Sequence, residues 1–428
     1  MSPVPIQEIL EGKHEAQKVT ARGWAHRKRE SKQTIFVILR DSSGVIQCTV
    51  KDDSPAWNDA HKLTIESSLL VEGTVKADKR APGGYEISVD KISTIGLAEP
   101  FPITSGQETE DFLRDIRHLW IRSRKMNLIM KIRGESQRLT HNFFQQQKFT
   151  EVSPPMFITS ACEGGSTLFG LKYFDQQMYL TQSAQLYLEI LIYSLEKVYC
   201  IAPSFRAEKS RTIRHLTEYW HIEAEQAFAD MNDLMRLEEE LLTYVCRNIA
   251  VSCKKEFQEL RADITKLDLV KTPFPRITYS EVIERLNAKD FKIEWGEDLG
   301  YDEEKAIADE FGKPFFIYDY PKQIKAFYCK TRRDKPEIAL STDMLVPRIG
   351  EISTGGARED DKDQLLARMK EQCLNEKDYD WYIDLRRYGS VPHVGFGMGL
   401  ERLLTWMLDL DNIIDAIPFP RTTRRFWP

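Results

Sequence analysis

The feature that most constrains this chain is a glycine at every second position immediately before a predicted helix. Gly395, Gly397 and Gly399 lead into Leu400-Glu401-Arg402. Alternating glycines take side chains off an extended segment, so a ligand can approach its backbone closely, and an arginine at the start of the following helix can point at phosphates. The run therefore favours a phosphate site built without a P-loop.

A second charged segment, far upstream, fits the same site. Arg206 and Glu208 precede a loop at residues 209–214 that carries further cations, and His215 follows it. Strand alternation puts Arg206 and Glu208 on one face, and the loop cations can bend over a polyphosphate. A solvated charged hairpin would explain the charges alone, but the glycine run that ends in Arg402 favours a triphosphate site.

Composition excludes several classes of protein. The chain has 428 residues, 42% of them hydrophobic, and a net charge of −6, which suits two or three domains and argues against indiscriminate polyanion binding. No run approaches the roughly 18 apolar residues of a membrane helix, and the N-terminus lacks the order of a signal peptide. Its seven cysteines form no CxxC pair, which speaks against a disulfide framework or a cysteine zinc site. We therefore expect a cytoplasmic protein with no membrane partner.

Strand-like segments dominate the first part of the chain. They lie at residues 19–24, 34–39, 45–50, 68–75 and 86–92, with a turn at Pro82-Gly83-Gly84. This rhythm predicts a five-stranded β-barrel of the oligonucleotide-binding (OB) type over residues 1–100. The stretch 101–122, which begins with prolines and acids, is predicted to be a linker or hinge.

The remainder, residues 123–428, is predicted to be a second domain of mixed helices and strands. Apolar spacing predicts a long amphipathic helix over residues 113–147 and further helices over 185–197 and 230–259. Strands are predicted at 151–156, 177–181, 198–202, 218–228, 314–318 and 326–330. The segment around 264–311 is predicted to be a small helical insertion without a catalytic pattern.

Three ordered segments resemble the signatures of class II aminoacyl-tRNA synthetases: 149–155 the first, 205–225 the second and 395–402 the third. A barrel followed by such a domain is similar to the aspartyl, asparaginyl and lysyl subgroup. The strings TQSAQLYLE, APSFRAEKSRTIRHLTEYWHIEAE and WYIDLRRYGSVPHVGFGMGLERL resemble asparaginyl-tRNA synthetases of the archaeal and eukaryotic kind. The resemblance implies an α+β protein, with an OB-type barrel before a class II catalytic domain whose antiparallel sheet is flanked by helices.

The resemblance also implies roles at the phosphates. Arg206 would hold the α-phosphate during attack by the amino-acid carboxylate, and Arg402 would hold the γ-phosphate side of a bent ATP, so these two are the expected catalytic residues. Mg²⁺ bridging the phosphates would be held by Asp343 and Glu351. The expected ATP-binding residues are Arg206, Glu208, Arg214, His215, Tyr219, Glu351 and Arg402.

The amino-acid pocket implied by the resemblance favours asparagine. Arg358 would read the side-chain carbonyl oxygen, and aspartyl enzymes carry a lysine where this chain has Leu188. Glu223 could accept hydrogen bonds from an amide and repel a carboxylate, whereas Glu189 is either a direct ligand or a group that orients Arg358. The expected amino-acid-binding residues are Glu163, Gln185, Glu189, Glu223 and Arg358.

The resemblance implies that the barrel reads the anticodon of tRNA(Asn). Phe36 would stack on the middle uridine and Gln47 would hydrogen-bond to it, although a place in the barrel core is the simpler explanation of Phe36. The expected anticodon contacts are Arg22, His26, Arg27, Phe36, Gln47 and Glu86.

The implied reaction is an asparagine–tRNA ligase reaction, in which L-asparagine and ATP give an adenylate and the tRNA 3′ end then attacks it. The first signature implies a homodimer. Three alternatives stay open: a non-discriminating aspartyl-tRNA synthetase, an ammonia-dependent asparagine synthetase and a non-catalytic RNA-binding relative. Leu188 speaks against the first, the complete barrel against the second and the intact phosphate arginines against the third. Val394 and Ser353-Thr354 depart from the usual pattern and could alter the polarity of the pocket.

Overall fold

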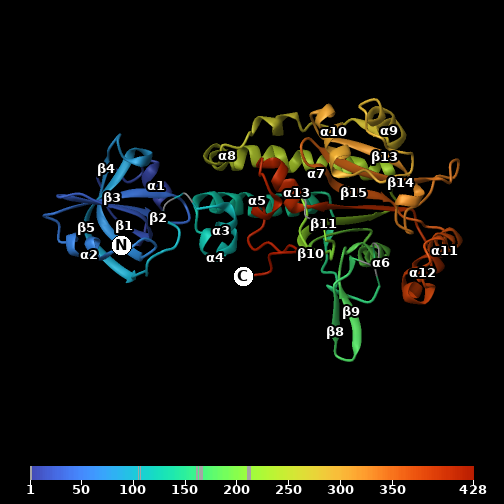
Figure 1. The fold of residues 1–428 in the computed structure, drawn as a ribbon, viewed down its shortest axis with the longest axis horizontal. Coiled ribbons are helices and arrows are strands. Elements are labelled where there is room, and N and C mark those ends of the chain that lie inside the picture. Colours follow the sequence, from blue (N-terminus) through green and yellow to red (C-terminus); the bar gives the residue numbers. More distant parts are fainter. Residues whose placement is uncertain (1, 105, 107, 161, 163–166, 210–213) are drawn as a thin grey trace. The chain divides into compact units, whose positions relative to one another are not determined.

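A computed structural model describes residues 2–104, 106, 108–160, 162, 167–209 and 214–428. By its internal contacts the chain divides into two compact units, Met1–Leu113 and Arg114–Pro428. The division falls within residues 101–122, where the sequence predicts a linker. Each unit is described separately below (Figure 1).

The first unit is a closed barrel, as predicted. Its strands follow the order β1-β2-β3-β5-β4, with short helices α1 and α2 beside them. Alternation decides what fills the barrel, since Ile35, Val37 and Leu39 of β2 are fully buried in its core. The elements are α1 (Ile6–Leu10), β1 (Lys18–Glu30), β2 (Thr34–Arg40), β3 (Val45–Lys51), α2 (Trp57–Lys62), β4 (Ser68–Ala77) and β5 (Tyr85–Gly96).

The second unit is built on an eight-stranded sheet in the order β12-β13-β14-β15-β16-β11-β10-β6. Adjacent strands are antiparallel except for the outer pairs β12/β13 and β10/β6. The strands are β6 (Thr150–Glu151), β10 (Lys197–Phe205), β11 (Glu218–Ala227), β12 (Arg276–Thr278), β13 (Phe315–Pro321), β14 (Ile338–Val346), β15 (Gly350–Ala357) and β16 (His393–Gly399). A separate three-stranded sheet, β7 (Phe157–Ile158), β9 (Gln176–Leu180) and β8 (Gly170–Tyr173), projects from it (Figure 1).

Helices cover both faces of the large sheet (Figure 1). Tyr199 of β10 stacks on Phe144 of α5 at 4.4 Å between ring centroids, whereas its neighbours Val198 and Cys200 pack with Leu188 of α6. The face beneath α6 is the one that carries the ligand cavities. The helices are α3 (Glu110–Asp115), α4 (Arg117–Trp120), α5 (Arg124–Gln146), α6 (Gln185–Leu195), α7 (Met231–Ser252), α8 (Lys254–Leu260), α9 (Tyr279–Asn287), α10 (Tyr301–Phe311), α11 (Lys362–Glu371), α12 (Asp380–Arg387) and α13 (Leu400–Met407).

Several sequence predictions of local structure need correction. The helix predicted over 113–147 is broken before Ser123, which caps α5 by accepting a hydrogen bond from the Met126 N–H. Residues 326–330 form turns and isolated bridges rather than a strand. The 264–311 segment contains not only helices α9 and α10 but also β12, which extends the large sheet.

The segment that enters the second unit is anchored to it by one arginine. Arg117 is 1% exposed, and its guanidinium donates to the backbone carbonyls of Ile414, Ile417 and Pro418. It also forms an ion pair with Asp415 at 3.3 Å. Part of the predicted linker therefore belongs to the packed structure of the second unit. Within the described residues, no helix is long and apolar enough to cross a membrane.

Candidate active site

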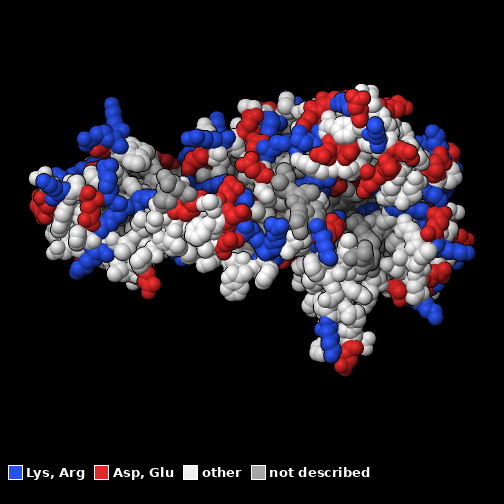
Figure 2. Space-filling view, in the orientation of Figure 1, with Lys and Arg blue, Asp and Glu red and all other residues white. Residues whose placement is uncertain are grey.

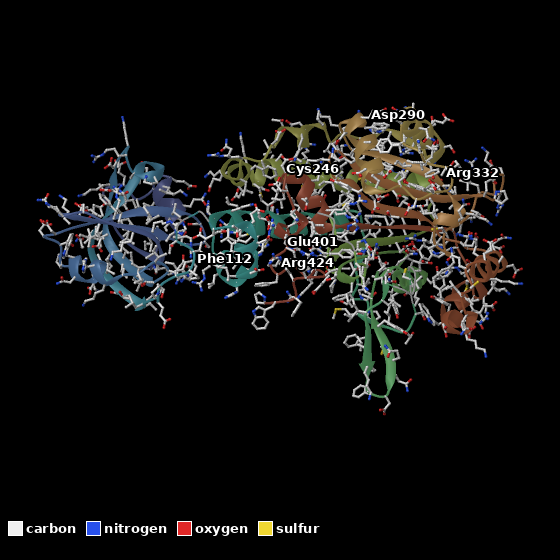
Figure 3. The ribbon with its side chains drawn as sticks, in the orientation of Figure 1. Phe112, Cys246, Asp290, Arg332, Glu401 and Arg424 are labelled. Atoms are coloured by element: carbon white, nitrogen blue, oxygen red, sulfur yellow. The ribbon has the colours of Figure 1, made fainter. Side chains whose placement is uncertain are left out.

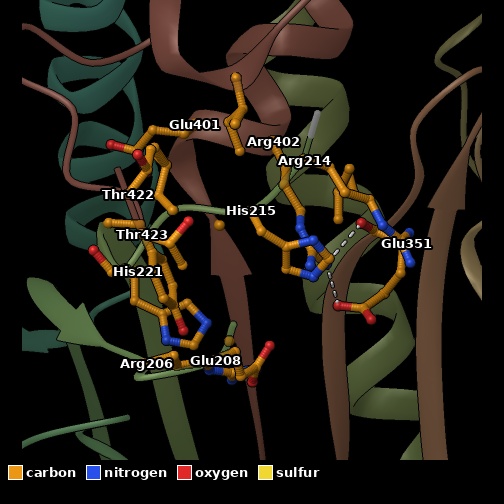
Figure 4. Close-up of a pocket in the computed structure, with 17 residues that line it drawn as sticks. Arg206, Glu208, Arg214, His215, His221, Glu351, Glu401, Arg402, Thr422 and Thr423 are labelled. Atoms are coloured by element: carbon orange, nitrogen blue, oxygen red, sulfur yellow. Dashed lines mark hydrogen bonds and ion pairs between the residues drawn. The ribbon is translucent and has the colours of Figure 1, made fainter. Parts of the chain in front are cut away.

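One cavity of the second unit gathers the phosphate residues predicted from the sequence (Figure 4). Its lining comes from β11, β15, β16 and the start of α13, and from the segments that follow β10 and α13. The predicted ATP residues that line it are Arg206, Glu208, Arg214, His215, Tyr219, Glu351 and Arg402. The fold therefore brings together side chains from three distant parts of the chain.

Arg402 and Glu351 form the polar wall of this cavity. Arg402 Nη1 donates to Glu351 Oε1 at 2.9 Å and to the Glu351 carbonyl at 3.1 Å. Burial opposes ionisation of Glu351, but Arg402 and Arg214 outweigh it and hold the pKa of that carboxyl at about 2. Burial, helped by Arg402 and Arg214, lowers the pKa of His215 to about 4. At neutral pH the wall presents ionised Glu351 and a neutral imidazole.

Arg206 stands at the mouth of the β10/β11 hairpin. Its backbone N–H donates to Thr217 O at 3.0 Å, which extends the strand pairing beyond Phe205. Its guanidinium carbon lies 5.8 Å from the centroid of the Tyr219 ring, within the range of a cation–π contact. The hairpin thus fixes both a guanidinium group and an aromatic face at one end of the cavity.

Glu304 of α10 is a residue that the sequence analysis missed. It is 7% exposed, forms an ion pair with Arg214 Nη1 and accepts the Glu351 N–H at 3.0 Å. Arg214 also lies over the Tyr301 ring, with 5.0 Å from its guanidinium carbon to the ring centroid. The 264–311 segment therefore supports the polar wall of the cavity directly, through Arg214 and Glu351. The only sequence signal for this role is an acidic residue in the first turn of an amphipathic helix.

A β-bulge brings both predicted metal acids onto one face of the sheet. Asp343 of β14 lies opposite Thr354 of β15, so the two side chains share a face. The next pairs are Met344 with Ser353 and Leu345 with Glu351. Ile352 is therefore an extra residue, and it turns Glu351 to the same face as Asp343.

These acids fit a magnesium site that the substrate completes. Asp343 forms an ion pair with Lys325 at 3.0 Å, and Glu351 forms one with Arg402 at 2.9 Å. Burial raises the pKa of Asp343, and the charge of Glu351 adds to this effect while Lys325 opposes it. Among the described residues no group of three or more His, Cys, Asp or Glu side chains could hold a metal. Two carboxylates with phosphate oxygens are the donor set that Mg²⁺ commonly takes in nucleotide enzymes.

A second cavity, of about 580 Å³, adjoins the first. The predicted residues Gln185, Glu223 and Arg358 line it. Glu223 accepts hydrogen bonds from the Ser183 hydroxyl and from the Ala184 N–H, the latter at 2.9 Å. Those two donors fix the position of the carboxylate on the cavity wall.

Glu225 is a second residue that the sequence analysis did not select. Arg358 donates to Glu225 Oε1 from Nε at 3.1 Å and from Nη2 at 2.5 Å, and both side chains line the cavity. Burial raises the pKa of Glu225 to about 7, against the effect of Arg358, and the charge of Glu189 adds to the rise. The arginine expected to read the substrate side chain is thus held by a weakly acidic carboxyl.

The alternating glycines make room for these β11 side chains. Gly395 lies opposite Glu225, and a Cβ there would come 2.0 Å from the Glu225 carboxylate. A Cβ on Gly397 would lie 2.5 Å from Nε2 of His221. The sequence analysis expected close approach of a ligand, whereas at Gly395 a neighbouring side chain occupies the space.

Glu189 and Leu188 lie away from the second cavity. Glu189 is fully buried, accepts hydrogen bonds from Gln185 and Tyr382, and forms ion pairs with Arg386 and His393. Its Oε1 lies 4.0 Å from Arg358 Nε. Leu188 packs in the apolar cluster under α6. Glu163, also predicted, lies outside the described residues.

The predicted anticodon residues lie on the barrel in two groups. Phe36 is half-buried on the outer face of β2, between inward-pointing Ile35 and Val37, and the Arg29 guanidinium carbon lies 5.3 Å from its ring centroid. Glu86 of β5 accepts hydrogen bonds from Gln47 Nε2 at 2.9 Å and from Thr49. Phe36 is therefore not a core residue.

The basic residues of β1 do not form one cluster. His26 approaches Arg40 Nη1 at 3.2 Å, and burial, with the charges of Arg27 and Arg40, lowers the pKa of its imidazole. Arg27 is exposed and donates to the His26 carbonyl. Arg22 lines a separate shallow pocket that also includes Asp41. The fold groups Phe36, Gln47 and Glu86, but it does not bring Arg22 to them.

Comparison with known proteins agrees with both units. The model of the class II tRNA synthetases (D, K and N) matches residues 109–423, and that of the OB-fold nucleic acid binding domain matches residues 19–95. The chain is 50% identical over 426 residues to the asparagine–tRNA ligase of Thermococcus gammatolerans, covering 99% of this chain and 98% of that protein. The asparagine–tRNA ligase of Thermoplasma acidophilum is 47% identical over 427 residues, and the match covers 99% of each protein.

A solved structure shows the same arrangement. Asparaginyl-tRNA synthetase from Pyrococcus horikoshii, complexed with asparaginyl-adenylate, superposes with a TM-score of 0.96 at 47% identity over 100% of both chains. The resemblance drawn from the sequence is confirmed. The chain belongs to the class II tRNA synthetases and, within them, to the asparagine–tRNA ligases.

Proposed function

We propose that this asparagine–tRNA ligase performs both of its steps at the junction of the two cavities. The observation that supports the proposal is that the cavities share part of their walls: Arg206, His221, Glu351, Gly397 and Arg402 line both. A triphosphate in the first cavity and an amino acid in the second would meet at Arg206. The carboxylate and the α-phosphate would then be held for in-line attack without a side-chain nucleophile.

The phosphate roles follow from this placement. Arg206 would stabilise charge on the α-phosphate as the asparagine carboxylate attacks, and Arg402 would hold the far end of the triphosphate. Tyr219 offers a face for the adenine. Asp343 and Glu351 would hold Mg²⁺, which neutralises the phosphate oxygens when bound.

Specificity would lie with the cluster around Arg358. Its guanidinium donates to the side-chain oxygen of asparagine, and the acids of β11, Glu223 and Glu225, accept from the amide nitrogen. The side-chain carboxylate of aspartate has no proton to donate to these acids and would be repelled by them. Binding of aspartate is therefore disfavoured. Gln185 would contact the substrate ammonium group, and Glu189 would keep Gln185 in place.

The decisive test is ATP–pyrophosphate exchange run separately with asparagine and with aspartate. We expect exchange with asparagine, at least 100-fold above that with aspartate, because a site that leaves buried polar groups unpaired rejects the wrong substrate strongly. Arg358→Lys should lower asparagine-dependent exchange and leave ATP binding intact. A preference for aspartate would refute the assignment.

We further propose that the barrel reads the anticodon of tRNA(Asn) and that the enzyme works as a homodimer. Phe36 supplies a stacking ring beside the hydrogen-bonding pair Gln47 and Glu86. Sedimentation equilibrium of the purified protein tests the dimer: a monomer at micromolar concentration would contradict it.

A further inference from the structure

A third cavity lies beside the phosphate cavity, and residues 421–426 form one of its walls. It shares with the phosphate cavity the residues Glu208, Thr217, Thr422 and Thr423. We call it the tail cavity. Its remaining lining residues are Phe169, Leu180, Phe205, Ala207, Lys209, Glu218, Arg421, Arg424, Arg425 and Phe426.

The 421–427 segment is held in place by backbone hydrogen bonds. The Thr217 N–H donates to Arg421 O at 2.9 Å, and Thr422 N–H donates to Arg425 O at 2.9 Å to close a turn. Arg425 forms an ion pair with Asp115. The segment therefore presents a defined surface next to the hairpin that carries Arg206.

The chemistry of this surface is cationic and aromatic. Arg424 is exposed, and within the described residues its guanidinium forms no ion pair. Phe426 and Trp427 are 79% and 78% exposed. Lys and Arg side chains gather on this part of the face in Figure 2, and Figure 3 labels Arg424 within it. The acids Glu208 and Glu218 lie on the hairpin side of the cavity.

Single-stranded nucleic acids bind surfaces that combine exposed aromatic rings with an exposed arginine. Bases stack on aromatic side chains whatever their sequence, while arginines track the phosphates. A protein partner would also cover such rings, but the continuity with the phosphate cavity favours RNA. In the proposed function, a ribose hydroxyl at an RNA 3′ end must reach the carbonyl carbon of the asparaginyl-adenylate beside Arg206, and AMP is the leaving group.

We propose that the 421–427 segment and the tail cavity bind the single-stranded 3′ end of the tRNA. Phe426 and Trp427 stack on unpaired bases, and Arg424 contacts the backbone phosphates between them. This inference rests on the proposed function and adds a surface that the adenylate-forming step does not use.

The test compares two reactions of the full-length enzyme. Phe426→Ala should raise the KM for tRNA(Asn) in charging by about tenfold, the usual effect of losing one stacked base. Arg424→Glu should raise it by about tenfold or more, because a phosphate contact is replaced by a like charge. Exchange of pyrophosphate with asparagine, which needs no tRNA, should stay within twofold because these residues line only the tail cavity. Matched controls are Arg333→Glu and Tyr388→Ala, which change exposed side chains that line none of the three cavities.

A truncated tRNA separates this surface from the rest of the RNA interface. Wild-type enzyme should bind a full transcript more tightly than one that lacks its four 3′ nucleotides, and Phe426→Ala should reduce that difference by about tenfold. Equal loss for both transcripts, or an unchanged KM, would overturn the proposal. If pyrophosphate exchange falls in parallel with charging, the segment supports the ATP site and does not bind tRNA. If Trp427→Ala changes the oligomeric state, the exposed rings pack against a second copy of the chain. Failure of the wild-type enzyme to exchange with asparagine would instead refute the proposed function.

Discussion

In the proposed function, two buried carboxyls on β11 set the chemistry of the amino-acid pocket. Glu225 holds Arg358 by two guanidinium contacts, and Glu223 is held by Ser183 and Ala184. The sequence analysis selected Glu223 and passed over Glu225, since both alternate along one strand and nothing in the residue types distinguishes them. What separates them is the cross-strand position of Arg358, which depends on the order of β15, β16 and β11.

Glu225→Gln should raise the KM for asparagine by about tenfold or more and leave the KM for ATP nearly unchanged, since a buried charge-assisted partner of Arg358 is lost. Glu223→Gln should act in the same direction. Exchange kinetics with each substrate varied in turn measure both effects. Unchanged asparagine kinetics in either variant would remove that residue from the pocket.

The raised pKa of Glu225, about 7, predicts a pH dependence. As pH falls below 7 the carboxyl gains a proton and loses its charge toward Arg358, so kcat/KM for asparagine should fall on the acid side. In Glu225→Gln this acid limb near pH 7 should be missing. Identical profiles for the two proteins would contradict the assignment.

At the scale of elements, the sequence predicted the barrel strands and most of β10 and β11, because apolar alternation marks them. It did not predict β14 or β15, and β15 is rich in glycine, serine and threonine. Here pairing with neighbouring strands overrides the weak local preference. The 264–311 segment was predicted as helical, but its contact with the polar wall of the phosphate cavity depends on tertiary packing alone.

Helix α10 should therefore affect ATP use. Glu304→Gln removes the charge that holds Arg214, and we expect the KM for ATP to rise about tenfold while the KM for asparagine stays constant. Glu303→Gln, the neighbouring acid on the same helix, is the matched control. Equal effects of the two substitutions would exclude a specific role for Glu304.

Helix α7 carries a buried acid that makes stability depend on pH. Ser353 Oγ donates to Glu238 Oε1 at 2.5 Å, and burial raises the pKa of Glu238 to about 8. The folded state keeps this proton to higher pH than the unfolded state, so its contribution to stability is lost as pH rises from about 4.5 to 8. Glu238→Gln should reduce that loss by on the order of 3 kcal/mol. Denaturant unfolding at pH 5 and pH 8.5 measures it, and parallel losses in both proteins would contradict the prediction.

At the scale of the whole molecule, the proposed function divides one reaction between a unit for chemistry and a unit for recognition. The phosphate and amino-acid cavities lie entirely in the second unit, and the predicted anticodon residues lie entirely in the first. Phe36→Ala should thus raise the KM for tRNA(Asn) by about tenfold or more through lost stacking, with asparagine-dependent exchange unchanged. Phe36→Tyr, which keeps a ring, should recover most of the charging activity. Loss of exchange in Phe36→Ala would show that the residue is structural.

The extra residue in β15 makes the site sensitive to strand register. If β14 and β15 paired without the bulge, Ile352 would lie opposite Leu345 and Glu351 would lie opposite Val346. Glu351 would then turn toward α7, on the far side of the sheet from Asp343 and the phosphate cavity. A slip of one position would keep every acid, arginine and glycine of the site in the chain and still lose the acid that faces the proposed ATP site.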